Sequence, residues 1–335
     1  MPVRVAVIVL SWNAADALLP CLAAVLRQSR PSDKLLVVDN ASADASIAQV
    51  AATLPEVEIL ANSRNLGFAG GMNVGLRHII AASPSFDVAV LLNQDTLVDP
   101  GWLAGLLAQF DEPQVAAVGS KIRYPDGRLQ HAGARLEWPL GLVRHVGWGE
   151  TDQGQYESPR DYALLTGAAL ALRLAALVEV GLFDEGFWPA YYEDVDLCWR
   201  LVRAGYRLVY APAATLAHQE SHSTRDEVTR MAYYHQGRLR YLLKRLSLTE
   251  LSEAFAPAEA SYCAARRATP EERALRWAYA QTLAHMHDIV AARMPLHLNE
   301  DAAHAHIVSV LHRLQQVPGQ THYHAALTSA QQLLG

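Results

Sequence analysis

Apolar runs alternate with amphipathic segments along the first part of this chain. Four nearly continuous apolar runs, rich in valine, isoleucine and leucine, predict buried strands at Val3–Leu10, Leu35–Asp39, Val57–Leu60 and Val88–Leu92. Between them, apolar residues at helical spacing predict helices over Asp16–Gln28 and Gly70–Ile80. Strands that alternate with helices indicate an α/β fold with a mostly parallel sheet covered on both faces.

The pattern changes twice further along the chain. Residues 120–162 are richer in Gly, Pro and aromatic residues and predict short strands and loops, of the kind that form a lid or a substrate wall. Thr166–Ala169 then leads into a predicted helix that runs to Val180, and Leu208–Ala217 is a further predicted strand. From Asp226 the pattern is helical almost to the end, so we expect two regions, 1–225 and 226–335.

Composition narrows the class of protein. The chain has 335 residues, 51% of them hydrophobic, which is enough for a large core. Its net charge of −6 and the lack of a basic stripe argue against a nucleic-acid partner. Three scattered cysteines suit a reducing compartment, and no apolar run reaches the ~20 residues that span a bilayer. We therefore expect a cytoplasmic protein.

Polar residues stand where three of the predicted strands end. Asn13 follows the first strand, Asp39 closes the second, and Asn93 and Asp95 follow the fourth. In open parallel sheets, ligands bind beyond the carboxyl ends of the strands. The coincidence of three polar strand ends therefore predicts a ligand site at this edge. Asn93 and Asp95 also offer two oxygen-bearing side chains at i and i+2, which suits Mg²⁺ or Mn²⁺, although Asn and Asp are common in plain loops too.

A glycine-rich segment, Asn65–Asn73, precedes the second predicted helix. Backbone N–H groups at such a helix start can bind phosphate, but an ordinary strand-to-helix turn is an equally simple interpretation. The segment is not the dinucleotide fingerprint, which should follow the first strand, where this chain has Ser11-Trp12-Asn13. This disfavours a nicotinamide-dependent dehydrogenase.

Three carboxylates crowd a stretch of aromatic residues at Tyr191–Arg200. Glu193, Asp194 and Asp196 lie within four positions, and a carboxylate among apolar neighbours gains a raised pKa that suits a general base. The competing interpretation is a helix start, where Asp and Glu are favoured. His218, at the end of a predicted strand, is a candidate third metal ligand, with His222 as the alternative.

The chain resembles the family 2 glycosyltransferases of the GT-A fold, and is most similar to their rhamnosyltransferase-like members. The resemblance covers roughly residues 3–245. It rests on motifs that occur in the family's order and spacing: Ser11–Asn13, Val38–Ser42, Asn65–Asn73, Leu92–Asp95, Gly181–Glu185, Glu193–Arg200 and His218. It implies a Rossmann-like GT-A catalytic domain with a C-terminal helical extension.

The resemblance also implies roles for individual residues. The residues that would bind the nucleotide sugar are Asn13, Asp39, Asn65, Gly67, Asn73, Asn93 and Asp95. Asp95, His218 and Asn93 correspond to the ligands of a divalent metal, Mg²⁺ or Mn²⁺. Asp194 corresponds to the catalytic base, with Glu193 and Asp196 in support. The implied reaction is inverting transfer from a nucleotide-diphosphate sugar, with dTDP-rhamnose favoured over UDP-sugars, to a hydroxyl of a glycan or lipid-linked saccharide in cell-surface polysaccharide synthesis.

Two features leave alternatives open. Asn93 stands where the family's metal motif begins with an acid, which weakens the expected metal affinity and motivates a second hypothesis, a catalytically silent nucleotide-sugar or glycan-binding module. The basic segment 226–247 suits peripheral contact with the inner membrane face, or a helix packed on the catalytic domain with its basic residues in solvent. Homodimerisation through the C-terminal helices is a further hypothesis.

Overall fold

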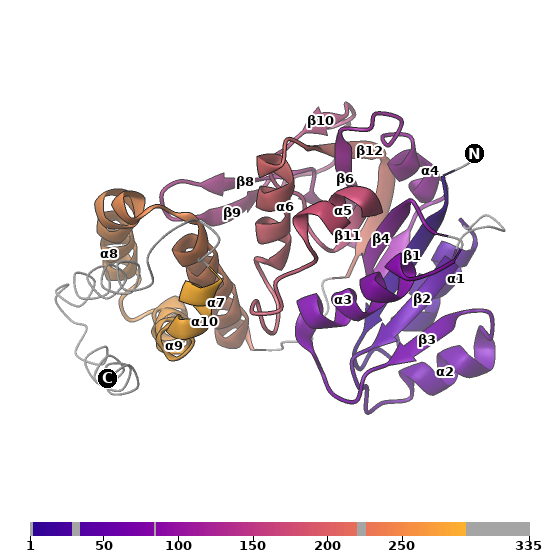
Figure 1. The fold of residues 1–335 in the computed structure, drawn as a ribbon, viewed down its shortest axis with the longest axis horizontal. Coiled ribbons are helices and arrows are strands. Elements are labelled where there is room, and N and C mark those ends of the chain that lie inside the picture. The colour runs from indigo at the N-terminus through magenta and orange to yellow at the C-terminus, as the bar shows by residue number, and fades with distance from the viewer. Residues whose placement is uncertain (1–2, 29–33, 84, 220–225, 293–335) are drawn as a thin grey trace. The chain divides into compact units, whose positions relative to one another are not determined.

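The computed structural model describes residues 3–28, 34–83, 85–219 and 226–292 (Figure 1). Their contacts group them into two compact units. The sheet unit comprises the described residues within Met1–Leu136, Val143–Pro189 and Glu193–Ser223. The helical unit comprises those within Glu137–Leu142, Ala190–Tyr192 and Thr224–Gly335. Two short segments from the middle of the chain thus belong with the C-terminal helices, which the predicted boundary at residue 225 did not anticipate.

One mixed sheet forms the centre of the sheet unit. Its main path runs β10-β12-β6-β11-β4-β1-β2-β3, and β1 pairs in parallel with both β2 and β4. The strands are β1 (Val5–Ser11), β2 (Lys34–Asp39), β3 (Glu58–Ala61), β4 (Val88–Asn93), β5 (Thr96–Val98), β6 (Val115–Arg123), β7 (Leu129–His131), β10 (Arg160–Asp161), β11 (Ala169–Arg173) and β12 (Arg207–His218). A separate two-stranded sheet pairs β8 (Ala134–Glu137) with β9 (Leu142–His145). The predicted α/β class with a mostly parallel sheet is confirmed.

Successive residues of a strand point to opposite faces of the sheet, so the two faces of β1 are covered by different helices. Val5, Val7 and Val9 of β1 belong to a buried apolar cluster with side chains of three helices: α1 (Leu18–Leu26), α2 (Ser46–Thr53) and α4 (Trp102–Leu107). The opposite face of β1 meets α3 (Gly67–Ile80). The remaining helices of this unit are α5 (Leu174–Val180) and α6 (Glu193–Arg203).

Two glycines of α3, Gly71 and Gly75, allow this helix to pack closely on β1. A Cβ on Gly75 would lie 2.8 Å from Ile8 Cγ2, and one on Gly71 would lie 2.4 Å from Leu10 Cδ1. These glycines therefore let α3 lie closer to β1 than any other residue would allow.

The prediction of one continuous helix from Ala169 to Val180 is wrong. Residues 169–173 form β11, which lies antiparallel between β4 and β6, and only Leu174–Val180 is helical. Ala169 to Leu172 are buried at the centre of the sheet. A short apolar run does not distinguish a buried strand from a helix by itself, so pairing with two neighbours decided the outcome.

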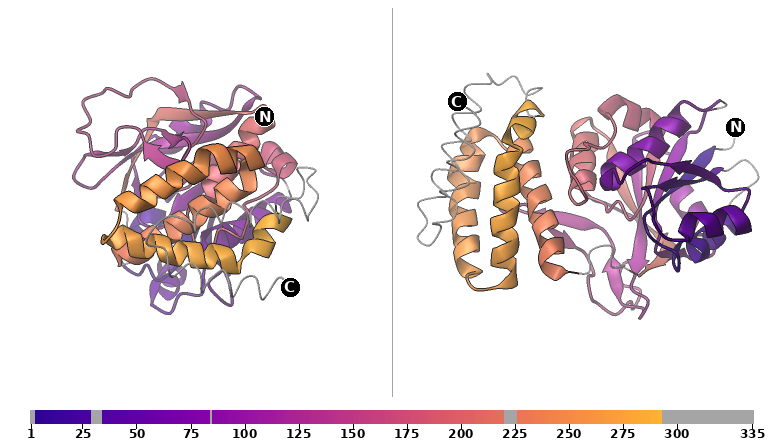
Figure 2. Two further views of the ribbon diagram at one scale, coloured as in Figure 1. Left: turned by 90° about the vertical axis from the view of Figure 1, so that its left-hand side faces the viewer. Right: turned by 90° about the horizontal axis from the view of Figure 1, so that it is seen from below.

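The described part of the helical unit contains α7 (Glu227–Arg245), a π-helical turn (Glu250–Phe255), α8 (Ala256–Ala265), α9 (Pro270–Ala284) and α10 (Met286–Ala291). Asp226 caps α7 by accepting from Thr229 N, and Thr269 caps α9 in the same way from Glu272 N. Helices α7 and α9 run side by side (Figure 2). The continuation of the predicted helices beyond residue 292, and with it part of the proposed dimer surface, lies outside the described residues. Within those residues, every helix is too short or too polar to cross a bilayer.

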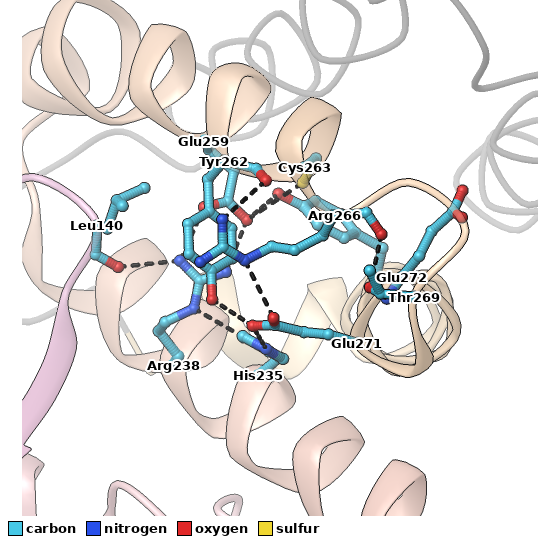
Figure 3. A network of polar contacts seen from close by, with 11 residues as sticks. Leu140, His235, Arg238, Glu259, Tyr262, Cys263, Arg266, Thr269, Glu271 and Glu272 are labelled. Atoms are coloured by element: carbon cyan, nitrogen blue, oxygen red, sulfur yellow. Dashed lines mark hydrogen bonds and ion pairs between the residues drawn. The ribbon is translucent and has the colours of Figure 1, made fainter.

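Three basic residues of α7 are buried, contrary to the expectation of a solvated basic face. Arg238 is fully buried and forms an ion pair with Glu259 (Figure 3). The Glu259 carboxylate also accepts from the Tyr279 hydroxyl. Burial alone would raise the pKa of Glu259, but the charge and hydrogen bonds of Arg238 outweigh it and hold that pKa below its ordinary range. Arg240 and Lys244 are buried too. Few basic side chains of α7 are therefore exposed for contact with a membrane surface.

Candidate active site

The ends of β1 and β2 are joined by Ser42. The Asp39 carboxylate accepts from Ser42 N and, at 2.6 Å, from Ser42 Oγ. Ser42 Oγ in turn accepts from Asn13 N, and Asn13 Oδ1 accepts from Ala43 N. Asn13 adopts a left-handed conformation (φ 49°), which Asn tolerates better than most residues. Asn13 and Asp39 thus belong to one linked cluster, which Ser42 holds together.

A second polar link runs from β2 to the start of α3 through Asn40, which is buried. Asn40 Nδ2 donates to Gly67 O at 2.9 Å, and Asn40 Oδ1 accepts from Asn62 and from Leu66 N. Asn65 Oδ1 accepts from Gly67 N, and Pro189 O accepts from Phe68 N. The N–H groups of residues 66 to 68 are therefore already used within the fold, so they are not a ready-made phosphate cradle.

Asn73 has a holding role. Its side-chain amide donates to Phe183 O and Glu185 Oε1 and accepts from Phe183 N. Arg77 also pairs with Glu185. This arrangement fastens the Gly181–Glu185 segment to α3 and leaves Asn73, at 1% exposure, well shielded from a ligand.

The three proposed metal ligands lie together at the ends of β4 and β12. His218 Nε2 is 3.2 Å from Asp95 Oδ1 and 3.4 Å from Asn93 Nδ2. His218 Nδ1 lies 2.8 Å from Gln130 Oε1, an acceptor that requires a proton on Nδ1. Nε2 is therefore the ring nitrogen that faces Asp95 and Asn93. An acceptor behind a histidine is the usual support of a metal ligand.

This donor set fits a divalent cation in part. Carboxylate, imidazole and amide oxygen suit Mn²⁺ and Mg²⁺, yet only Asp95 and His218 are strong ligands. No cluster of three or more His, Cys, Asp or Glu residues suited to a metal occurs in the described ranges. A bound cation would therefore take further oxygens from another source, as Mg²⁺ sites do from substrate phosphates. His222, the alternative ligand, lies outside the described residues.

Asp194 lies in the first turn of α6, and both of its carboxylate oxygens are held. Oδ2 accepts from Gly167 N at 2.8 Å and Oδ1 accepts from Val195 N at 2.8 Å. Burial raises the pKa of the Asp194 carboxyl above its ordinary 3.8, against the opposing effect of these hydrogen bonds. A carboxylate with a raised pKa is a stronger proton acceptor. The helix-start and general-base interpretations therefore describe the same residue.

Asp194 is connected to the edge where Asn93 lies. Asn93 N donates to Ala168 O, and the adjacent Gly167 donates to Asp194. Asp196 lies at 0% exposure and accepts from Arg200, whose guanidinium also donates to the carbonyls of residues 180 to 182. Asp196 thus orients the preceding loop, whereas Glu193 is buried beside the base.

The model of the glycosyltransferase-like family 2 matches residues 2–240 of this chain. The chain belongs to that family. It is 34% identical over 184 residues to the pre-mycofactocin glycosyltransferase of Mycobacterium tuberculosis. That alignment covers 53% of this chain and 36% of the relative. It is also 32% identical over 241 residues to the N-acetylglucosaminyl-diphospho-decaprenol L-rhamnosyltransferase of the same species, covering 66% of this chain and 78% of the relative.

The fold of this family 2 member matches that of a mannosyltransferase from Pyrobaculum calidifontis, solved with GDP-Man and Mn²⁺. The two share 18% sequence identity at a TM-score of 0.52, over 98% of this chain and 80% of the other. The predicted GT-A fold is confirmed by this likeness. The chain spans little more than a third of the length of the first of these relatives, the pre-mycofactocin enzyme.

Gln130 was not identified from the sequence, because it lies in the region predicted as short strands and loops. We predict that Gln130→Met lowers the affinity for Mn²⁺ about 10-fold or more in the presence of dTDP, since loss of a supporting hydrogen bond typically costs that much. Isothermal titration calorimetry measures the affinity. Gln153→Met, an exposed position of the same unit, is the control. Equal Mn²⁺ affinity in both variants would contradict the supporting role.

The neighbouring His131 predicts a pH-dependent stability. Its Nδ1 lies 2.7 Å from Nδ1 of His145, and burial, together with the His145 charge, holds the pKa of His131 well below 6.5. The unfolded chain therefore binds more protons than the native one as the pH falls below 6.5, and the native state loses stability there.

We expect the His131 imidazole to lower the free energy of unfolding by up to about 1.4 kcal/mol per pH unit below pH 6.5. Urea unfolding of the wild type at pH 7.5 and 5.5 should show the loss, and His131→Gln should reduce it. His285→Gln, at an exposed position, should leave it unchanged. A His131→Gln variant with the full wild-type loss would refute the assignment.

Proposed function

We propose that this protein transfers a sugar from a nucleotide-diphosphate sugar to an acceptor hydroxyl with inversion at the anomeric carbon. The observation that carries the proposal is the position of Asp194. It combines a raised pKa, two hydrogen bonds that hold its carboxylate, and a direct link through Gly167 and Ala168 to the edge that carries Asn93. Membership of the family supports the reaction class.

In the proposed reaction, the acceptor oxygen forms a bond with the anomeric carbon while the bond from that carbon to the donor phosphate breaks. The hydroxyl proton passes to the Asp194 carboxylate, and the nucleoside diphosphate leaves with the bonding electron pair. A divalent cation held by Asp95 and His218, with Asn93, would supply positive charge for that diphosphate. Asp39 and Asn13 would receive the nucleoside, with Asn65 and Gly67 shaping the wall beside it.

The favoured donor is dTDP-rhamnose, with UDP-sugars as the alternative. The similarity to the decaprenol-linked rhamnosyltransferase supports this choice and suggests a lipid-linked saccharide as acceptor, in polysaccharide synthesis. The Mn²⁺ and GDP-Man in the mannosyltransferase structure support a metal-assisted nucleotide-sugar site in this chain.

A panel of nucleotides tests the donor site. We expect dTDP and dTDP-rhamnose with Mn²⁺ to raise the melting temperature, since ligand at 100 times Kd stabilises the native state by about 2.7 kcal/mol. Asp39→Asn should lose most of this shift, whereas Asp111→Asn, at an exposed position, should retain it. Larger shifts with UDP or GDP would reassign the donor, and no shift with any nucleotide would reject the proposed function.

Substitution of the base tests the chemistry. Asp194→Asn should lower kcat about 10²- to 10⁴-fold, the usual contribution of a general base, while the dTDP-induced thermal shift persists. Because burial raises the pKa of Asp194, the wild-type kcat should also fall with decreasing pH at values above 3.8. The assay uses dTDP-rhamnose and a synthetic N-acetylglucosaminyl-diphospho-lipid. Asp126→Asn, at an exposed position, is the control.

A transfer rate for Asp194→Asn near that of the wild type would reject the base assignment. Tight nucleotide-sugar binding by the wild type, with neither transfer nor slow donor hydrolysis, would instead favour the silent binding module that the uncharged Asn93 suggests.

A further inference from the structure

Two consecutive tyrosines adopt left-handed backbone conformations just before α6. Tyr191 has φ 82° and Tyr192 has φ 72°, values that side chains with a Cβ rarely adopt. Such strain persists only where the surrounding structure enforces it, and it concentrates at functional positions. The next two residues are Glu193 and Asp194, so the strained pair determines how the chain enters the helix that carries the proposed base.

The chain is anchored on both sides of this pair within the sheet unit. On one side, Pro189 O accepts from Phe68 N at 2.7 Å, and a Cβ on Gly67 would lie 2.7 Å from that same oxygen. On the other side, Asp194 accepts from Gly167 N. Between these two anchors, only Ala190–Tyr192 belongs to the helical unit. The strained segment is thus short, and the chain on either side of it is held at Pro189 and at Asp194.

Within the helical unit, Tyr192 is held by the segment that leads up to β9 and by α7. Its hydroxyl donates to Gly141 O at 2.7 Å, and its ring, at 2% exposure, packs against the rings of Tyr234 and Tyr241. A Cβ on Gly237 of α7 would lie 2.4 Å from Tyr191 O. The backbone of the pair therefore lies directly against this helix, at a place where only glycine fits.

The same helix holds the acceptor of the Tyr192 hydroxyl in place. Arg238, the residue after Gly237, donates to Leu140 O at 2.9 Å, next to Gly141, and also donates to Glu259 and to His235 Nδ1 (Figure 3). A Cβ on Gly141 would lie 2.7 Å from Leu242 Cδ2 of α7. One helix thus fixes both the strained pair and the carbonyl to which it is tied.

We propose that Tyr192 is a positioning residue for Asp194: by its seat on α7 and Gly141, it sets the backbone at the start of α6 and thereby the direction of the Asp194 carboxylate. This assigns the C-terminal helices a part in orienting the base. The inference rests on the proposed function for its catalytic meaning, but its structural part is measurable without any substrate. Tyr192 acts through the chain and does not itself exchange a proton with the acceptor.

Tyr192→Phe removes the hydroxyl and keeps the ring. Tyr262→Phe is the matched control, because Tyr262 is a buried tyrosine of the same unit whose hydroxyl binds the Glu271 carboxylate. Gly237→Ala is a second, independent variant, which pushes on Tyr191 O. Melting temperatures of all variants identify any that fail to fold.

The first measurement is amide hydrogen exchange in a peptide that covers Glu193–Cys198. We expect faster exchange there in Tyr192→Phe and Gly237→Ala, with the rest of α6 and the sheet unchanged, and no change at this peptide in Tyr262→Phe. Wild-type exchange in both Tyr192→Phe and Gly237→Ala would overturn the positioning role, whether or not the protein transfers rhamnose.

The second measurement is steady-state transfer from dTDP-rhamnose to the synthetic N-acetylglucosaminyl-diphospho-lipid. Displacing a catalytic group by about 1 Å costs on the order of 10²-fold in rate, so we expect kcat to fall by about 10- to 100-fold with the KM for dTDP-rhamnose unchanged. An equal kcat loss in Tyr262→Phe would reduce Tyr192 to a stability contact and overturn the proposal. Absence of wild-type transfer would instead count against the proposed function.

Discussion

Parallel pairing of β1 with β2 and β4 brings the ends of three strands to one edge of the sheet, and the candidate site depends on that constraint. Ser11 lies opposite Asp39, and Leu10 lies opposite Asn93, so the loops that follow begin at neighbouring points. The fold closes this edge with Gln94, whose side chain both accepts from Trp12 N and donates to Trp12 O. The distance between the residues proposed for the nucleotide and those proposed for the metal is thus set by strand spacing, which a rigid sheet holds constant.

Two different solutions to burying charge appear in the same chain. Asp194 is held by backbone N–H groups alone, which leaves its pKa raised and its carboxylate suited to accept a proton. Glu259 faces a buried guanidinium, which holds its pKa low and keeps it charged. The first arrangement suits the proposed base and the second is structural, because among the described residues only the second supplies a full opposite charge. The helical unit is therefore built around an ion pair, and the proposed site around an uncompensated carboxylate.

The glycine-rich segment shows why composition alone misleads about function. Gly71 and Gly75 permit close packing of α3 on β1, and Gly67 permits the close approach of Pro189. The N–H groups at the helix start are occupied by Asn40, Asn65 and Pro189. The segment therefore ties the edge after β2 to the chain that leads into α6. Its place beside the proposed nucleotide site follows from packing, with no phosphate cradle required.

Hydrophobic period alone determined one part of the sheet unit: the strands at β1, β2, β3 and β4, the helix α3 and the polar strand ends Asn13, Asp39 and Asn93 follow from runs and alternation in the sequence. The tertiary structure decided what depends on partners distant in the chain. An Ala-Leu run became β11 because two strands flank it, the Gln130 side chain came to contact His218 across 88 positions, and Arg238 of α7 came to pair with Glu259. The left-handed Tyr191 and Tyr192 likewise carry no sequence signal, since their conformation is enforced by α7 and Gly141. The local pattern of apolar residues predicts helices and strands because it shows which face of each is buried. The role of a polar side chain depends instead on which distant atom the fold places beside it.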